Sequence, residues 1–319
     1  MPVEKILLAA PRGYCAGVDR AVQTVEKALK LYGAPVYVRK EIVHNKHVVQ
    51  DLRAAGAVFV EELDDSIPEG AITVFSAHGV SPMVHDDAKQ RKLQTIDATC
   101  PLVTKVHREA VKFAADGFTI VLIGHAGHEE VEGTMGEAPE HIVLVETEDD
   151  VAKLEVADPD KVAYISQTTL SVDETNSIIA ALRVKFPNIT GPRTDDICYA
   201  TTNRQMAVRQ MAPHCDLVLV IGSANSSNSN RLVEVARECG AGSYLIDNES
   251  EVRAEWLEDV SVIGISSGAS APEELVQRLV DYLVDDSEAT VEEFEVVQED
   301  VRFMLPKTIR VAETAAASA

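Results

Sequence analysis

Two hydrophobic patterns alternate along the chain. The first consists of runs of four to six aliphatic residues, such as AITVF, TIVLIG and LVLVIG. The second consists of longer segments in which apolar residues recur every three or four positions, such as CPLVTKVHREAVKFAA. Short aliphatic runs predict buried strands, whereas the longer period predicts amphipathic helices. Strands that alternate with helices in this way are typical of an α/β protein with small parallel sheets.

The order of these elements repeats three times. Each unit begins with a cysteine at the start of a predicted helix and continues with a polar loop after a strand, an acidic loop, and a second polar loop after a later strand. A repeated order indicates similar structural units related by pseudo-symmetry, here a pseudo-threefold axis. We therefore expect three similar α/β units at 1–99, 100–194 and 195–285, followed at 286–319 by an acidic C-terminal extension and disordered tail.

The spacing within the three units is nearly constant. After 28 or 29 residues each cysteine is followed by a polar loop residue, namely His44 after Cys15, His128 after Cys100 and Ser226 after Cys198. Ligands of open parallel sheets bind outside the carboxyl ends of the strands, where these polar loops lie. If the three units face one another by those ends, the loops line one central cavity and the three cysteines meet at its axis.

Composition restricts the class of partner. The net charge of -23 argues against nucleic acid and against an anionic membrane surface, because both are bound by clustered Lys and Arg. No apolar stretch approaches the length of a membrane span. The five cysteines, an odd number without close pairs, do not resemble a secreted disulfide framework. We therefore expect a cytoplasmic enzyme whose partners are small molecules or proteins.

Cys15, Cys100 and Cys198 occupy equivalent positions in the three units. Three thiolates around one axis suit a [4Fe–4S] cluster, which normally has four cysteine ligands. With three ligands one iron stays open, much as catalytic zinc keeps an open position. A zinc site completed by a histidine is the alternative, although the C-x-x-C pairs of structural zinc sites are absent. Cys215 and Cys239 lie outside the repeated positions and are interpreted as ordinary buried side chains.

The polar loops carry groups suited to binding phosphate. Protonated histidines and hydroxyl groups bind phosphate oxygens through charge-assisted hydrogen bonds, and a loop before a helix adds the amides of the helix N-terminus. Taken singly, each such residue is more often a surface or capping group. The loop residues of this kind are His44, His78, His125, His128, Ser226, Ser227, Asn228 and Ser270.

Two neighbouring glutamates offer a proton donor. Glu129 and Glu130 share a loop with His128, and a carboxyl group in an enclosed site can hold a proton and deliver it to a reacting group. Thr168 and Thr169 follow a predicted strand and can relay that proton, unless they only form a turn or a helix cap. The residues alone do not favour Glu130 over Glu129.

Seven segments resemble a known family and stand in that family's order: APRGYCAGVDRAV, DATCPLVTKVH, GHEEVEGTMGE, SQTTLSVDET, DDICYATTNRQ, GSANSSNSNRL and SSGASAPEELV. Together they extend over residues 5–285, and the family is that of the IspH/LytB reductases. The resemblance implies three α/β domains in a pseudo-threefold arrangement around one [4Fe–4S] cluster. It also implies the last step of non-mevalonate isoprenoid synthesis. In that step two electrons and two protons convert 4-hydroxy-3-methylbut-2-enyl diphosphate into isopentenyl and dimethylallyl diphosphates and water.

The same resemblance implies roles for individual residues. Cys15, Cys100 and Cys198 resemble the cluster ligands, which leave one iron open. Glu130 with Thr168 resembles the pair that delivers the proton. The residues that resemble the diphosphate site are His44, His78, His128, Ser226, Ser227, Asn228 and Ser270, and Thr169 lies close to it.

Three hypotheses for the activity follow from these residues. The first is an iron–sulfur reductase of a small allylic diphosphate, which implies an electron-donor protein of the ferredoxin or flavodoxin type. The second is a zinc-dependent hydrolase of a phosphorylated metabolite. The third is a non-catalytic sensor that carries a cluster. The dense polar loops favour an enzyme over a sensor, because a sensor does not need a binding site of the size of a diphosphate.

Overall fold

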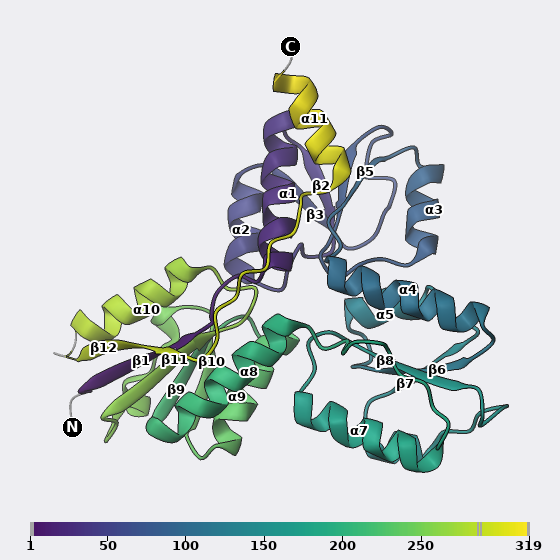
Figure 1. Cartoon of the computed structure of the whole chain (residues 1–319). Helices are drawn as coiled ribbons and strands as arrows, with labels where there is room; N and C mark the ends of the chain where they lie inside the picture. Colours follow the sequence, from purple (N-terminus) through teal and green to yellow (C-terminus); the bar gives the residue numbers. More distant parts are fainter. Residues whose placement is uncertain (1–2, 286, 288, 318–319) are drawn as a thin grey trace. The chain divides into compact units, whose positions relative to one another are not determined.

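The structure is a computed structural model that describes residues 3–285, 287 and 289–317 (Figure 1). It is a mixed α/β fold with three small sheets, as predicted, and every strand pair in the described residues is parallel. The chain divides into two compact parts, which are described separately below. The first part consists of Met1–Asp19, His44–Gln50 and Tyr199–Arg302, and the second of Arg20–Val43, Asp51–Cys198 and Phe303–Ala319.

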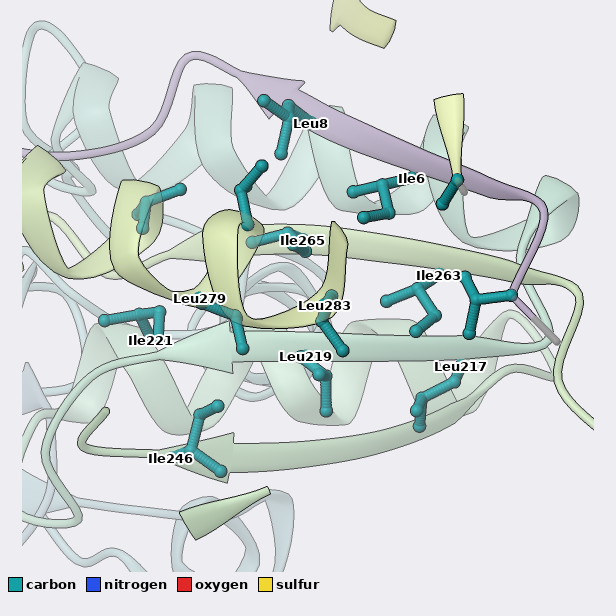
Figure 2. Packing of buried hydrophobic residues seen from close by; sticks show 14 of the residues in the cluster. Ile6, Leu8, Leu217, Leu219, Ile221, Ile246, Ile263, Ile265, Leu279 and Leu283 are labelled. Atoms are coloured by element: carbon teal, nitrogen blue, oxygen red, sulfur yellow. The ribbon is translucent and has the colours of Figure 1, made fainter. Parts of the chain in front are cut away.

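The first part contains a five-stranded sheet with the order β10-β9-β11-β1-β12. Its strands are β1 (Lys5–Ala10), β9 (Leu217–Ile221), β10 (Gly242–Ile246), β11 (Val262–Ser267) and β12 (Thr290–Glu295). Alternate residues of β9 pack into two different clusters, with Leu219 against helix α10 and Val218 against helices α8 and α9. Figure 2 shows Leu279 and Leu283 of α10 next to Leu219 and Ile265 of the sheet. Helices therefore cover both faces of the central strand β9, which is why its sequence, LVLVI, is aliphatic throughout.

The second part contains two smaller sheets. One has the order β3-β2-β4-β5 and consists of β2 (Val36–Arg39), β3 (Ala57–Val60), β4 (Ile72–Phe75) and β5 (Gln94–Asp97). The other has the order β7-β6-β8 and consists of β6 (Thr119–Ile123), β7 (Ile142–Val145) and β8 (Val162–Ser166). All strands of each sheet run parallel, so the loops after the strands gather at one edge.

Helices follow most of the strands. The described α-helices are α1 (Ala16–Tyr32), α2 (Lys46–Ala54), α3 (Pro82–Gln90), α4 (Pro101–Ala115), α5 (Glu129–Met135), α6 (Glu148–Lys153), α7 (Val172–Lys185), α8 (Tyr199–Met211), α9 (Ser227–Glu238), α10 (Glu273–Asp285) and α11 (Lys307–Ala317). Short 3₁₀ turns occur at Ala212–His214, Glu249–Glu251 and Ala254–Leu257. None of the helices in the described residues is long and apolar enough to span a membrane.

The strand β1 differs from the predicted first unit, 1–99. It lies between β11 and β12 and is in register with Val262–Ile265, whereas the other strands of 1–99 form a sheet of their own. Its sequence, KILLAA, is aliphatic and buried on both faces. The hydrogen bonds of a parallel ladder join backbone groups, so such a strand carries no sequence signal for the sheet that it joins.

The C-terminal extension also differs from its prediction. β12 pairs with β1 along its whole length, and Lys307–Ala317 forms the helix α11 instead of a disordered tail. Ala, Glu and Arg favour a helix, and Pro306 stands directly before its first turn. The helix α11 lies along α1 (Figure 1). Ile309 is fully buried, and Lys27 of α1 pairs with Glu313. Residues 286, 288, 318 and 319 of the predicted extension lie outside the described residues.

Ile309→Ala should loosen α11. The side chain is 0% exposed, so its truncation should cost about 2–5 kcal/mol. The amides of Lys307–Ala317 should then exchange with deuterium much faster, as measured by mass spectrometry. Val311→Ala is the matched control, because Val311 in the same helix is 58% exposed. Equal exchange in both variants would show that α11 is not held by Ile309.

Candidate active site

Each of the three repeated cysteines stands directly before a helix, as predicted. Cys15 precedes α1, Cys100 is the N-cap residue of α4, and Cys198 precedes α8. Each backbone amide donates a hydrogen bond to a carbonyl in a loop that follows a strand, β11, β4 or β8. The acceptors are Ala269 at 3.1 Å, Ala77 at 2.9 Å and Thr168 at 3.0 Å, in that order. The three cysteines are therefore equivalent in local structure as well as in sequence, and none is in a disulfide.

The surroundings of Cys15 bear on its charge. Burial raises the pKa of the Cys15 thiol, whereas the amide of Val18 and the positive charge of Arg204 act in the opposite direction. The Val18 amide donates to Sγ at 3.4 Å from the first turn of α1. A thiol in this position stays protonated unless something stabilises the thiolate, and a coordinated metal does so strongly. A ligand role for Cys15 therefore rests on its place directly before a helix, which it shares with Cys100 and Cys198.

Glu130 is held by Thr168 in the second part. Glu130 is the second residue of α5, and it is only 2% exposed. Its Oε1 accepts a hydrogen bond from the backbone amide of Thr168 at 2.6 Å, and its Oε2 accepts one from the Thr168 hydroxyl at 3.0 Å. The two predicted catalytic residues are therefore in direct contact, in a buried place where a proton can pass between a carboxyl group and a hydroxyl group.

His128 caps the same helix. Its Nδ1 accepts a hydrogen bond from the Glu130 amide at 3.1 Å. An Nδ1 that accepts carries no proton, so the neutral ring carries its proton on Nε2. The Nε2–H group of His128 is therefore a hydrogen-bond donor that is not used by α5, and phosphate oxygens need such donors.

Glu129 has a different role from Glu130. Its Oε2 lies 2.9 Å from Nδ1 of His78, in the loop after β4. The rings of His78 and His128 meet edge to face, with 5.9 Å between their centres. This contact holds the His78 ring beside that of His128. The sequence did not separate the two glutamates, because only the fold shows that Glu129 reaches His78 and Glu130 reaches Thr168.

Thr169 lies beside this pair. Its hydroxyl accepts a hydrogen bond from the side-chain Nε2 of Gln167 at 3.0 Å. The side-chain Oε1 of Gln167 accepts one from the backbone amide of His125 at 3.1 Å. Gln167 is buried and was not predicted as a site residue. The sequence offered one indication of a role for Gln167, because this residue directly precedes Thr168 and Thr169.

The other predicted residues lie in the first part, around the start of α9. Ser226 is the N-cap residue, and its side chain accepts from the Ser229 amide at 3.3 Å. Asn228, in the first turn, is 4% exposed. Neither its amide nitrogen nor its amide oxygen has a hydrogen-bond partner in the described residues. A buried side-chain amide without partners is costly, and a polar ligand at this helix start would satisfy it.

His44 and Ser270 are joined in the first part. The Ser270 hydroxyl donates to the carbonyl of His44 at 2.9 Å, and Nδ1 of His44 lies 3.3 Å from the amide nitrogen of Asn225. Ser270 thus fixes the backbone of His44 and lies before α10 without being its N-cap residue. Asn225 was missed in the sequence, although it lies in the same run of Ser and Asn residues as Asn228.

Comparisons with known proteins agree with the predicted resemblance. The family model described as "LytB protein" matches residues 6–284. A 4-hydroxy-3-methylbut-2-enyl diphosphate reductase of Streptomyces avermitilis is 61% identical over 307 residues, which cover 96% of this chain and 90% of that protein. The enzyme of the same name from Cutibacterium acnes is 59% identical over 314 residues, which cover 98% of this chain and 97% of that protein.

Solved structures give the same result. The E-1-hydroxy-2-methyl-but-2-enyl-4-diphosphate reductase of Plasmodium falciparum has a TM-score of 0.96 and 39% sequence identity, and the match covers 99% of this chain and 100% of that one. A second structure, of the enzyme described as terminal in the non-mevalonate pathway, has a TM-score of 0.63 and 30% identity over 89% of this chain and 100% of that one. Because the family model spans most of the sequence and the relatives are similar over nearly all of it, the chain belongs to the LytB protein family.

Proposed function

We propose that this protein is a 4-hydroxy-3-methylbut-2-enyl diphosphate reductase. The reaction adds two electrons and two protons to the allylic alcohol diphosphate, releases the hydroxyl group as water, and gives isopentenyl and dimethylallyl diphosphates. The observation that carries the proposal is the buried Glu130 carboxylate in contact with both donors of Thr168. The chain that carries this contact is about 60% identical to proteins of that name.

Cys15, Cys100 and Cys198 would hold one [4Fe–4S] cluster and leave one iron without a protein ligand. The donor set fits this group, because soft thiolates select iron–sulfur clusters. A coordinated metal would also offset the burial that raises the pKa of the Cys15 thiol. When bound, the cluster would supply the two electrons and a Lewis-acidic position beside the substrate hydroxyl. An odd number of cysteines without close pairs suits a reducing cytoplasm, and the electron donor would be a ferredoxin or a flavodoxin.

The diphosphate would be bound by two sets of residues. In the first part, the start of α9 offers Ser226, Ser227 and the amide of Asn228, in the field of a helix N-terminus that favours anions. His44 and Ser270 complete that set. In the second part, His78 and the Nε2 proton of His128 offer charge-assisted hydrogen bonds, with Thr169 close by.

Glu130 would hold the proton that leaves with the hydroxyl group. Its position is fixed on both oxygens by Thr168, so the carboxyl group needs no reorientation before it donates a proton. The Thr168 hydroxyl can donate to or accept from the carboxyl group, and so can pass the proton across a short path to the substrate oxygen. The helix cap at His128 holds the Glu130 backbone in the same place.

Anaerobic purification distinguishes this proposal from its alternatives. Iron and sulfide analysis should find about four irons per chain, and single turnover with a reduced viologen should consume the allylic diphosphate. A colourless protein with stoichiometric zinc would instead identify the hydrolase. A protein with a cluster but no turnover of this substrate would identify the sensor.

Glu130→Gln should abolish turnover and spare the cluster. Gln keeps the shape and can still accept from Thr168, but it cannot donate the proton, so kcat should fall by about 10²–10⁴. Iron content and the visible spectrum should match the parent protein. Glu132→Gln, an exposed residue in the same helix, should leave kcat unchanged. Full activity of Glu130→Gln would remove Glu130 from the proton path.

Asn228→Ala and Asn228→Asp should weaken diphosphate binding to different extents. Loss of one hydrogen bond to a charged group costs about 1.5–3 kcal/mol, so Asn228→Ala should raise KM by one to two orders of magnitude. Asn228→Asp adds a negative charge, which the helix N-terminus tolerates but the diphosphate repels, so KM should rise further. Asn188→Ala, at an exposed site, is the control. Unchanged KM values in both variants would show that the diphosphate does not contact Asn228.

A further inference from the structure

Three basic side chains contact the loops that lead into the three cysteines. They lie on the second turns of the helices that the cysteines begin, five or six residues further on: Arg20 after Cys15, Lys105 after Cys100 and Arg204 after Cys198. Each donates hydrogen bonds to backbone carbonyls of a different cysteine loop from the one that precedes its own helix. We call these three side chains the cysteine-loop clamps.

Arg20 contacts the loop before Cys100. Its Nη1 donates to the carbonyls of Ala98 at 2.8 Å and Thr99 at 3.0 Å, the two residues directly before that cysteine. Its Nε donates to the carbonyl of Met304 at 2.9 Å, in the segment that leads to α11. The helix that begins after Cys15 therefore fixes the backbone before Cys100.

Lys105 contacts the loop before Cys198. Its ammonium group donates to the carbonyls of Thr194 at 2.6 Å and Asp195 at 3.0 Å, and to Oδ1 of Asp196 at 2.9 Å. The other oxygen of Asp196 accepts from the backbone amide of Ser166 in β8 at 2.9 Å. The helix that begins after Cys100 therefore ties the backbone before Cys198 to the sheet.

Arg204 contacts the loop before Cys15. This arginine is 0% exposed, and its Nη2 donates to the carbonyl of Gly13 at 2.8 Å. Its Nη1 lies 3.1 Å from Glu299, which neutralises the buried charge. Gly13 has a φ of +71°, a conformation that most residues avoid and that glycine adopts without steric cost. The helix that begins after Cys198 therefore fixes the backbone before Cys15.

The three contacts form a closed order. The helix of Cys15 holds the loop of Cys100, the helix of Cys100 holds the loop of Cys198, and the helix of Cys198 holds the loop of Cys15. We infer that Arg20, Lys105 and Arg204 are positioning residues that fix the backbones of the three cysteines for cluster binding and retard loss of the cluster. The claim that the clamps fix the cysteine backbones rests on the loop contacts alone. The claim that they retard loss of the cluster rests on the proposed function.

The energetics support a positioning role. Each clamp donates to carbonyls within four residues of a cysteine, and a hydrogen bond from a cationic donor is about twice as strong as a neutral one. In addition, the backbone N–H of each cysteine donates the hydrogen bond described above to the carbonyl of Ala269, Ala77 or Thr168. Each cysteine backbone is thus held on both sides, by its own amide and by the carbonyls that precede it.

Hydrogen exchange tests the order of the contacts. The variants Arg20→Met, Lys105→Met and Arg204→Met keep an unbranched apolar side chain and remove the cation. In the anaerobic full-length protein, each should speed exchange about tenfold in the loop that its clamp holds, since each loses at least one charged hydrogen bond. The loops are 96–100 for Arg20→Met, 194–198 for Lys105→Met and 12–15 for Arg204→Met. Exchange in the other two cysteine loops should stay closer to that of the parent protein.

Matched controls lie on the same helices. Lys30→Met in α1 and Lys112→Met in α4 remove exposed cations, and Arg209→Met in α8 removes one that lies 4.0 Å from Glu238. These should leave exchange in all three loops unchanged. Where Arg204→Met does not fold, Arg204→Lys keeps the charge with fewer donors and should give an intermediate rate in loop 12–15.

Cluster loss is the second measurement. Release of iron to a chelator, followed by visible absorption in the absence of air, should be about tenfold faster in the clamp variants than in their controls. Arg20→Lys and Lys105→Arg should restore part of the retention. Equal rates in clamp and control variants, or faster exchange only in the loop of the clamp's own helix, would overturn the inference. A parent protein that binds no iron would instead overturn the proposed function.

Discussion

The hydrogen bond from each cysteine amide to a carbonyl after a parallel strand is the constraint on which the site depends. A helix N-terminus has amides without partners inside the helix, and the end of a parallel strand has carbonyls without partners beyond the ladder. At Cys15, Cys100 and Cys198 these two needs are met by one bond, which places a thiol at the edge of a sheet. The polar loops lie at the same edges, so the residues proposed to bind iron and those proposed to bind phosphate come from the same structural position.

The sequence predicted the parts of this arrangement that repeat. Three cysteines before helices, and His128 and Ser226 before α5 and α9, follow from a period that local sequence preserves. Long aliphatic strands such as β9 were predictable because burial on both faces leaves no polar position. The contact between Glu130 and Thr168 was predicted only through the family resemblance, since 38 residues separate the two and neither has a local pattern that requires the other.

The parts that failed depend on contacts between distant segments. KILLAA fits either of two sheets by composition, and only packing beside β11 decides its place. The alanine-rich C-terminal end was predicted to be a disordered tail because it contains few large apolar residues. The burial of Ile309, which holds the helix, is not evident from its neighbours in sequence. The contacts of Arg20, Lys105 and Arg204 could not be predicted for a related reason. Their acceptors are backbone carbonyls, which every residue has, so nothing in the sequence marks the loop that each side chain reaches.

The choice between arginine and lysine follows from the shape of each loop. Arg20 faces two consecutive carbonyls and a third acceptor on another segment, which suits the separate N–H groups of a planar guanidinium. Lys105 faces three acceptors on three consecutive residues, which converge on one point and suit the three donors of an ammonium group. Arg204 is fully buried, where a guanidinium is less costly than an ammonium group because it is more weakly hydrated. The geometry of the backbone acceptors in each loop therefore decides which of the two cations it binds, while Asp196 and Glu299 balance the charges of Lys105 and Arg204.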